Sequence, residues 1–177
     1  MAIRIEELSS ANQHDLNRVD GTFTIDSVLD VSATGFGDKL YFTPVAPYEK
    51  RYPPDTFDIP KYIASPDKAA YFAYVDNILA GQVVLRRNWN RCAYIEDIAV
   101  DLSFRRHGVG KALMDVTREW TSSQGLPAIM LETQNNNPNA CRFYYAYGFK
   151  IGGYDRYLYV GANFKTPEIA LFWYYFL

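Results

Sequence analysis

The feature that most constrains the fold is a short glycine-containing stretch near the middle of the chain, residues 105–110, which reads RRHGVG. It follows residues 94–100, an apolar run typical of a buried strand, and leads into residues 109–122, whose apolar side chains recur at helical spacing. A helix that starts after such a turn exposes the backbone N–H groups of its first turn, and these groups bind phosphate well. Gly108 and Gly110 have no Cβ, so a ligand can approach the backbone there. The stretch predicts a strand-turn-helix unit with a pyrophosphate site.

Two common glycine motifs do not fit this stretch. A Walker A loop needs a glycine at the position that Arg105 occupies, and a dinucleotide-binding fingerprint needs a small residue where Leu113 stands. What remains is the spacing Arg-x-x-Gly-x-Gly, in which a second arginine, Arg106, adds fixed positive charge. A plain alternative, a glycine turn that only starts a helix, stays open at this point.

Strand and helix patterns occupy most of the remaining chain. Strands are expected at residues 2–8, 69–75, 78–87, 92–100, 128–133, 149–160 and 169–177, with strand-like segments at 23–25 and 40–42. Turns are expected at residues 76–77 and 35–38, and a second helix at 139–147 that ends at Gly148. A loop-rich region with at most a short helix at 59–64 is marked by Pro44, Pro47, Pro53, Pro54 and Pro60. This order indicates a mixed α/β protein with an antiparallel start and a strand-helix-strand core.

Composition and charge limit the classes of partner. The 177 residues suit one domain, and the formal net charge of −2 argues against a general nucleic-acid or anionic-membrane binder. The charge is compatible with a cationic small-molecule substrate. Cys92 and Cys141 show neither metal-ligand spacing nor a disulfide framework. We find no signal-peptide pattern and no apolar run of membrane-spanning length, so the expected location is the cytoplasm.

Four local patterns follow one another in an order that resembles a known superfamily. They are IEDIAV at residues 95–100, the Arg-x-x-Gly-x-Gly loop, Asn137-x-x-Ala140-x-x-x-Tyr144, and YGF at residues 147–149. Together they resemble the acetyl-CoA half of the GNAT N-acetyltransferases. Within that superfamily the chain is similar to the streptothricin acetyltransferases, on the segments 131–136, 140–141, 148–149, 152–153, 172–176 and 45–48.

The resemblance implies a fold and an activity. The expected fold is mixed α/β, with a central, mostly antiparallel twisted sheet that contains a splayed parallel strand pair and is flanked by helices. One domain would span residues 1–177, with residues 1–68 mainly on the substrate side and 69–177 forming the acetyl-CoA core and the last strands. The implied reaction moves acetyl from acetyl-CoA to a primary amine of a small cationic antibiotic, the β-lysine amine of streptothricin. Alternatives are another amine (a polyamine, an aminoglycoside or a protein lysine) or a non-catalytic acyl-CoA-binding module.

The resemblance also implies which residues hold the cofactor. Backbone groups of Ile98, Ala99 and Val100 would pair with the pantetheine amides, as an added strand would. The pyrophosphate would be held by residues of one loop: Arg105, Arg106, His107, Gly108, Val109, Gly110 and Lys111. Asn137 would bind the cofactor through its amide or cap the second helix, and both roles can hold together. No metal, nucleic-acid or membrane partner is expected, and a homodimer is left open.

Two side chains are the expected catalytic groups. Acyl transfer to an amine needs a base, because only the neutral amine attacks, and Glu96 on the strand before the loop could accept the proton directly or through water. A structural pairing of Glu96 with a lysine or arginine is the open alternative. Strict alternation places Glu96 and Asp97 on opposite faces of this strand, with Asp97 anchoring substrate or serving the structure. Tyr144 could protonate the departing thiolate, with a cofactor-positioning or core role as the alternative.

The substrate side is the least constrained part of the sequence. Asp30 and Tyr48 are candidate substrate contacts, together with Glu96 and Asp97, since a cationic substrate calls for carboxylates and aromatic walls. Cys141 has no histidine near it in sequence, so we expect a small packed side chain and not an acetyl-cysteine nucleophile.

Overall fold

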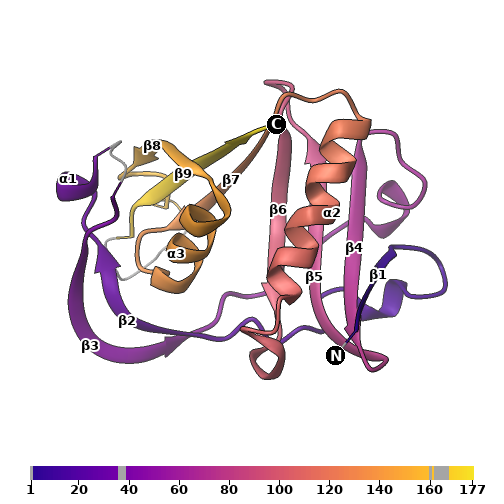
Figure 1. The fold of residues 1–177 in the computed structure, drawn as a ribbon, viewed down its shortest axis with the longest axis horizontal. Coiled ribbons are helices and arrows are strands. Elements are labelled where there is room, and N and C mark those ends of the chain that lie inside the picture. Colours follow the sequence, from indigo (N-terminus) through magenta and orange to yellow (C-terminus); the bar gives the residue numbers. More distant parts are fainter. Residues whose placement is uncertain (1, 36–38, 160, 162–167) are drawn as a thin grey trace. The chain divides into compact units, whose positions relative to one another are not determined.

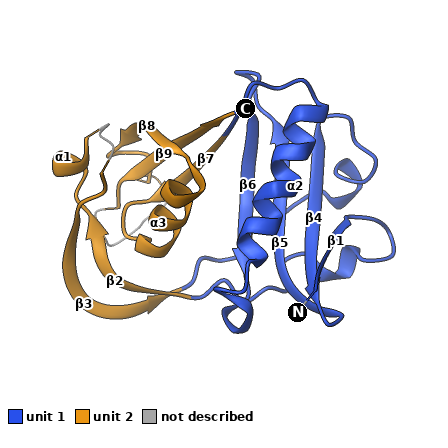
Figure 2. Ribbon diagram, in the orientation of Figure 1, with its two compact units in different colours: residues 1–22, 51–129, 177 blue, residues 23–50, 130–176 orange. Residues whose placement is uncertain are grey.

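The computed structural model describes residues 2–35, 39–159, 161 and 168–177. The chain divides into two compact units, drawn in blue and orange in Figure 2. Unit 1 comprises residues 1–22, 51–129 and 177, and unit 2 comprises residues 23–50 and 130–176. Each unit has its own buried core and is described separately. The prediction that they form a single acetyltransferase domain stays a prediction.

Unit 1 is an antiparallel sheet with a helix on one face. Its strands are β1 (Ile3–Glu7), β4 (Lys68–Val75), β5 (Ile78–Arg87) and β6 (Ala93–Val100), each antiparallel to the next in the order β1-β4-β5-β6. Helix α2 (Val109–Ser123) packs across this sheet (Figure 1). Short 3-10 helices stand at η1 (Gln13–Asp15), η2 (Ile59–Lys61) and η3 (Leu102–Phe104). These bounds confirm the predicted strand-turn-helix unit.

Local sequence explains the sharp hairpin between β4 and β5. Asp76 and Asn77 have φ angles of 50° and 62°, the left-handed values that a two-residue hairpin turn needs and that Asp and Asn adopt more readily than most residues. The turn predicted at this position is therefore confirmed. The turn opposes Val75 to Ile78 and Tyr74 to Leu79, and a register shift between Ala73 and Tyr74 then opposes Phe72 to Gln82.

The two faces of the unit 1 sheet are packed differently. Apolar side chains of α2, including Val109 and Leu113, are buried against the face that carries Gly81. A Cβ on Gly81 would lie 2.9 Å from the carbonyl oxygen of Ala99 and 3.0 Å from both Val109 and Leu113, so only glycine lets the helix lie this close. The opposite face carries a second buried cluster: Leu8, Tyr62, Ala70, Phe72, Tyr74 and Val84.

Unit 2 combines a two-stranded sheet with the C-terminal strands and a helix. Strands β2 (Phe23–Leu29) and β3 (Phe42–Lys50) pair antiparallel, and the short helix α1 (Val31–Thr34) stands between them in sequence. Strand β7 (Ala128–Gln134) begins in unit 1 and continues into unit 2, where β8 (Lys150–Asp155) pairs antiparallel with β9 (Ala170–Phe176). Helix α3 (Pro138–Tyr147) ends at Gly148, whose φ of 113° confirms the predicted glycine stop.

Most of strand β3 was not predicted from the sequence, since the strand-like segment expected at 40–42 reaches only its first residue, Phe42. Pro44 and Pro47 indicate a loop, yet both lie within β3. Proline is tolerated in a strand that pairs on one edge only, because the missing N–H can fall on the unpaired edge. The two-stranded sheet of β2 and β3 meets that condition. Strand β8 ends earlier than predicted, at Asp155, and residues 36–38 of the predicted turn lie outside the described part of the chain.

The sheet order confirms the predicted fold class. In the described part of the chain, seven strands are hydrogen-bonded in the order β1-β4-β5-β6-β7-β9-β8, mostly antiparallel, with β6 and β7 as the parallel pair. The strand-helix-strand path from β6 through α2 to β7 is the connection that a parallel pair requires. This is the mixed α/β arrangement of the GNAT fold.

Candidate active site

The loop between β6 and α2, residues 105–111 and here called the phosphate loop, has an unusual backbone. Arg106 and Gly108 have φ angles of 67° and 87°, so the chain turns twice through left-handed conformations before the helix begins. Gly108 is the N-cap of α2 and offers no side-chain oxygen to the first-turn N–H groups. Its carbonyl oxygen accepts the N–H of Ala112, at 3.0 Å. The N–H groups ahead of Ala112 have no carbonyl of this helix to bind, so they can bind an anion.

Arg105 shapes the phosphate loop through the backbone. Its Nε donates to the carbonyl oxygen of Val100 at 3.1 Å, and its Nη2 donates to that of Thr22 at 2.6 Å. The guanidinium therefore ties the loop to the end of β6. Because its side chain is committed to these two carbonyls, the exposed Arg106 is the better placed of the two arginines to meet a phosphate.

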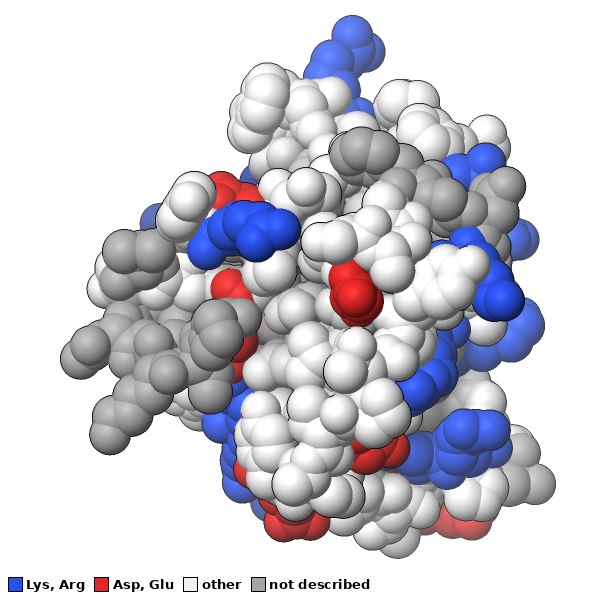
Figure 3. Space-filling view, turned by 90° about the vertical axis from the view of Figure 1, so that its left-hand side faces the viewer, with Lys and Arg blue, Asp and Glu red and all other residues white. Residues whose placement is uncertain are grey.

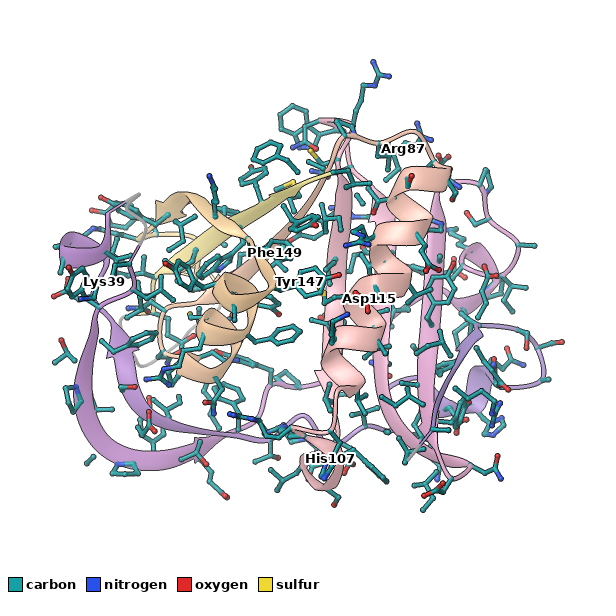
Figure 4. The ribbon with its side chains drawn as sticks, in the orientation of Figure 1. Lys39, Arg87, His107, Asp115, Tyr147 and Phe149 are labelled. Carbon is teal, nitrogen blue, oxygen red and sulfur yellow. The ribbon has the colours of Figure 1, made fainter. Side chains whose placement is uncertain are left out.

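Two further predicted cofactor residues lie at the start of α2. His107 is exposed in the loop immediately before the helix, as Figure 4 shows. The Lys111 ammonium donates to the carboxylate of Asp115 one turn along the helix, at 2.6 Å, and the two side chains are 70% and 37% exposed. An ion pair of this kind contributes little to stability, so Lys111 remains able to exchange Asp115 for a phosphate.

A β-bulge in β6 places two neighbouring carboxylates on one face of the sheet. Val84 pairs with Asp97, whereas the next residue, Leu85, pairs with Ile95, so Glu96 is the extra residue. Glu96 reaches Arg86 and Asp97 reaches Gln82, two side chains that point to the same face of β5. The prediction that Glu96 and Asp97 lie on opposite faces is therefore wrong, because strict alternation fails at a bulge.

Both carboxylate oxygens of Glu96 have partners. The hydroxyl of Tyr62 donates to Oε2 at 2.6 Å, and Nε of Arg86 donates to Oε1 at 3.1 Å. The side chains of Arg86 and Glu96 are 32% and 21% exposed, so the ion pair is partly shielded from water. Burial raises the pKa of Tyr62 above its usual value, and the hydrogen bond to Glu96 raises it further. This is the arginine pairing that the sequence left open for Glu96.

Asp97 has a different environment from its neighbour. Its Oδ2 accepts a hydrogen bond from Nε2 of Gln82 at 2.6 Å. Gln82 is itself fixed, because its Oε1 accepts the backbone N–H of Asn17 at 2.8 Å. Burial raises the pKa of Asp97 above its usual value, and the charge of Asp55 adds to this effect. Asp97 as a residue is nevertheless not fully buried.

In unit 2, the predicted cofactor residues lie on α3. Oδ1 of Asn137 accepts the backbone N–H of Ala140 at 3.2 Å, which confirms that Asn137 caps the helix. Gly148 ends the helix, and the N–H of Phe149 then bonds the carbonyl oxygen of Tyr144 at 2.9 Å. The Tyr-Gly-Phe pattern at residues 147–149 therefore marks the end of α3, where the backbone folds back onto the last turn of the helix.

Tyr144 is buried among aromatic rings of unit 2. Its ring centroid lies 5.8 Å from that of Phe149 and 6.0 Å from that of Trp173. The ring centroid of Tyr147, three residues along the helix, lies 6.1 Å from that of Phe149, and both residues are labelled in Figure 4. The rings fix the position of the Tyr144 phenol, which is what a proton donor or a cofactor-positioning group requires.

Comparison with known proteins places this arrangement in a family. Residues 38–149 match the model of the acetyltransferase (GNAT) family. The chain belongs to that family. It is 45% identical over 130 residues to streptothricin acetyltransferase A of Bacillus subtilis, which covers 73% of each chain. It is 36% identical over 154 residues to a streptothricin acetyltransferase of Escherichia coli, which covers 87% of this chain and 85% of the other.

Solved structures agree with this membership of the GNAT family. A Bacillus anthracis protein in complex with acetyl coenzyme A is 38% identical, with a TM-score of 0.88 over 99% of this chain and 100% of the other. Nourseothricin acetyltransferase is 36% identical, with a TM-score of 0.81 over 98% of both chains. The protein is thus an acetyl-CoA-dependent acetyltransferase, as predicted from the phosphate loop and the patterns around it.

The phosphate loop of this acetyltransferase fits acetyl-CoA. An anion needs N–H donors free of intrahelical partners, a close approach to the backbone and positive charge nearby. The first turn of α2, Gly108 and Arg106 supply these three properties. Among the described residues, no group of three or more His, Cys, Asp or Glu side chains is arranged to hold a metal ion. None of the helices in the described chain is both long and apolar enough to cross a membrane.

Of the two substrate contacts predicted in the N-terminal part of the chain, Asp30 has a local structural role. Oδ1 of Asp30 accepts the N–H of Ala33 and caps α1. Tyr48 lies on β3 opposite Ile25 and is 42% exposed. On the face of the molecule that Figure 3 shows, most residues are uncharged, and acidic and basic side chains interrupt this surface in small groups. Substrate binding by Asp30 and Tyr48 stays a prediction.

Sequence reasoning missed the partners of the two carboxylates. Tyr62, Gln82 and Arg86 contact Glu96 or Asp97, yet none of them was named as a candidate. One signal was available in the sequence, because Gln82 interrupts the apolar part of β5, residues 78–85. In the structure its side chain is buried. Tyr62 gave no such signal, since it lies in the proline-rich region, 34 residues from Glu96.

Proposed function

We propose that this acetyltransferase moves acetyl from acetyl-CoA to a primary amine of a small cationic antibiotic, the β-lysine amine of streptothricin. The observation that carries the proposal is the similarity to streptothricin acetyltransferases at 45% and 36% identity over 73% and 87% of the chain. The similarity to nourseothricin acetyltransferase over 98% of both chains supports the same substrate class. A net charge of −2 suits a cationic substrate.

Each part of the site has a proposed role. The backbone N–H groups of the phosphate loop bind the pyrophosphate, and backbone groups of Ile98 to Val100 pair with the pantetheine amides. Acetyl-CoA, once bound, supplies an activated thioester. The proton of the amine goes to a carboxylate of β6, for which Glu96 is the prediction from sequence. Tyr144 donates a proton to the departing thiolate, and Asn137 holds the start of α3.

Mass spectrometry tests the proposed substrate directly. Purified protein is incubated with acetyl-CoA and streptothricin, and the antibiotic should gain the mass of one acetyl group. Fragmentation should place that group on the β-lysine side chain. A parallel assay of free CoA thiol uses a polyamine, an aminoglycoside and a lysine peptide as acceptors. Turnover of one of these without acetylation of streptothricin would refute the substrate, and no thiol release with any amine would refute the activity.

A further inference from the structure

The β6 bulge places the carboxylates of Glu96 and Asp97 on one face of the sheet, but only Glu96 is paired with a cation. Glu96 accepts from Arg86, a fixed cation, and from the hydroxyl of Tyr62. Among the described side chains, Asp97 accepts from the Gln82 amide, and no lysine, arginine or histidine pairs with it. Gln82 donates without carrying charge. The structure thus contains one satisfied carboxylate and one carboxylate that still lacks a cation.

Both oxygens of Glu96 already have partners within the protein. Oε2 accepts the hydroxyl of Tyr62, and Oε1 accepts Nε of Arg86 in a partly shielded ion pair. A substrate ammonium group that bound Glu96 would have to compete with these donors, and breaking a shielded ion pair is costly. Its contacts instead order Tyr62 and Arg86 on the face of the sheet that Asp97 shares. These contacts suit a positioning residue.

The environment of Asp97 favours proton uptake. Burial and the negative charge of Asp55 both raise its pKa, so it holds a proton more readily than an ordinary aspartate does. Among the described residues, Asp55 from the segment before β4 is the charge that acts on Asp97. The neighbouring Glu96 is surrounded by Arg86 on β5 and by Tyr62, whose hydroxyl also accepts from the ammonium of Lys68 on β4 at 3.4 Å. A shielded carboxylate without a cation is stabilised when a cation arrives. The substrate proposed above is an amine, which is an ammonium ion at neutral pH.

We infer that Asp97, and not Glu96, is the carboxylate that binds the substrate ammonium group and takes its proton. This inference rests on the proposed acetyl transfer to an amine. The ammonium N–H bond breaks and its proton goes to Asp97, which leaves a lone pair on nitrogen. The nitrogen then forms a bond to the acetyl carbon while the C–S bond breaks and sulfur keeps the electron pair. Nitrogen loses a second proton, sulfur gains one, and Asp97 returns its own proton to solvent.

Three variants test this division of roles. Asp97→Asn keeps the shape of the side chain and removes the base, and Glu96→Gln removes the charge that faces Arg86. Asp76→Asn is the matched control, because Asp76 is exposed in the β4–β5 turn and takes no part in the site. The value of kcat/KM for the amine is measured for each variant from about pH 7 to about pH 9, a range over which the neutral fraction of an amine rises.

Asp97→Asn should lower kcat/KM by roughly 10²-fold or more near neutral pH, the usual scale for a lost general base. The deficit should shrink as the pH rises, because more substrate is already neutral. Glu96→Gln should show a smaller deficit that does not shrink with pH. The melting temperature of Asp97→Asn should equal or exceed that of wild type, since a carboxylate without a cation is removed.

Other results overturn the inference. If Asp97→Asn keeps more than about a tenth of the wild-type kcat/KM, the inference is wrong, because loss of a general base lowers the rate by more than that. The inference is also wrong if the deficit of Asp97→Asn stays constant with pH, or if the deficit of Glu96→Gln is the one that shrinks as the pH rises. These outcomes are distinct from failure of the proposed function. If wild type acetylates a different amine, streptothricin is refuted as the substrate and the same variants are measured with that amine.

Discussion

At the scale of single residues, Tyr144→Phe removes one hydroxyl and keeps the ring of the side chain. Phenylalanine keeps the ring contacts to Phe149 and Trp173, so the melting temperature of Tyr144→Phe should change little. Acetyl-CoA affinity should also change little, whereas kcat should fall by roughly 10²-fold or more if the hydroxyl is the general acid. Steady-state kinetics and calorimetry measure these quantities, with Tyr147→Phe on the same helix as the control. A drop in kcat below about tenfold would make Tyr144 a positioning residue.

Cys141 is a second residue whose environment decides its role. Its side chain is fully buried on α3, and burial raises the pKa of its thiol to about 12. The nucleophilic thiolate is therefore negligible at neutral pH. We expect Cys141→Ala to keep most of the wild-type kcat and to lose about 1 kcal/mol of unfolding free energy through the small cavity it leaves. An acetyl adduct on Cys141 in the intact mass spectrum would contradict direct transfer.

At the scale of elements, the phosphate loop depends on two left-handed residues. Gly108 has a φ of 87°, and an alanine there would be strained by roughly 1–2 kcal/mol. Gly108→Ala should therefore weaken acetyl-CoA binding several-fold in calorimetry, because relief of the strain moves the first-turn N–H groups of α2. Gly21→Ala is the control, since Gly21 does not have a left-handed φ and its Cβ would meet no atom within 4 Å. Unchanged affinity in Gly108→Ala would show that these N–H groups do not hold the phosphates.

Sequence periodicity predicted the elements better than their contacts. Strands with a continuous apolar run and helices bounded by glycine, such as α2 and α3, were found within a few residues, because burial and turn chemistry act locally. The bulge in β6 was not found, since the register shift between Val84 and Leu85 depends on how two strands pair. Its effect on Glu96 and Asp97 was missed for the same reason.

At the scale of the whole molecule, the family and fold followed from short patterns, and the detailed site did not. The phosphate loop and the start of α3 are each contiguous in sequence, so their residues could be named as candidates from sequence alone. The pairing of Glu96 with Tyr62 joins residues 34 positions apart, and only the folded chain brings them together. Strand β3 shows the same limit, because its prolines are compatible with a strand only when the unpaired edge is known.

The glycine in the middle of β5 has a consequence for how this enzyme can change. Gly81→Ala would crowd the carbonyl oxygen of Ala99 on β6 and the side chains of Val109 and Leu113, so we expect α2 to shift away from the sheet. Gly153→Ala on β8, where a Cβ meets nothing within 4 Å, is the control. We expect Gly81→Ala to lose more free energy of acetyl-CoA binding, measured by calorimetry, than free energy of unfolding, measured by thermal denaturation. The reason is that the first turn of α2 moves, whereas most of the packing of the helix can adjust. Equal losses in the two free energies would contradict this prediction. A substitution on β5, a strand that carries none of the predicted cofactor contacts itself, is therefore expected to change acetyl-CoA affinity through its neighbours β6 and α2.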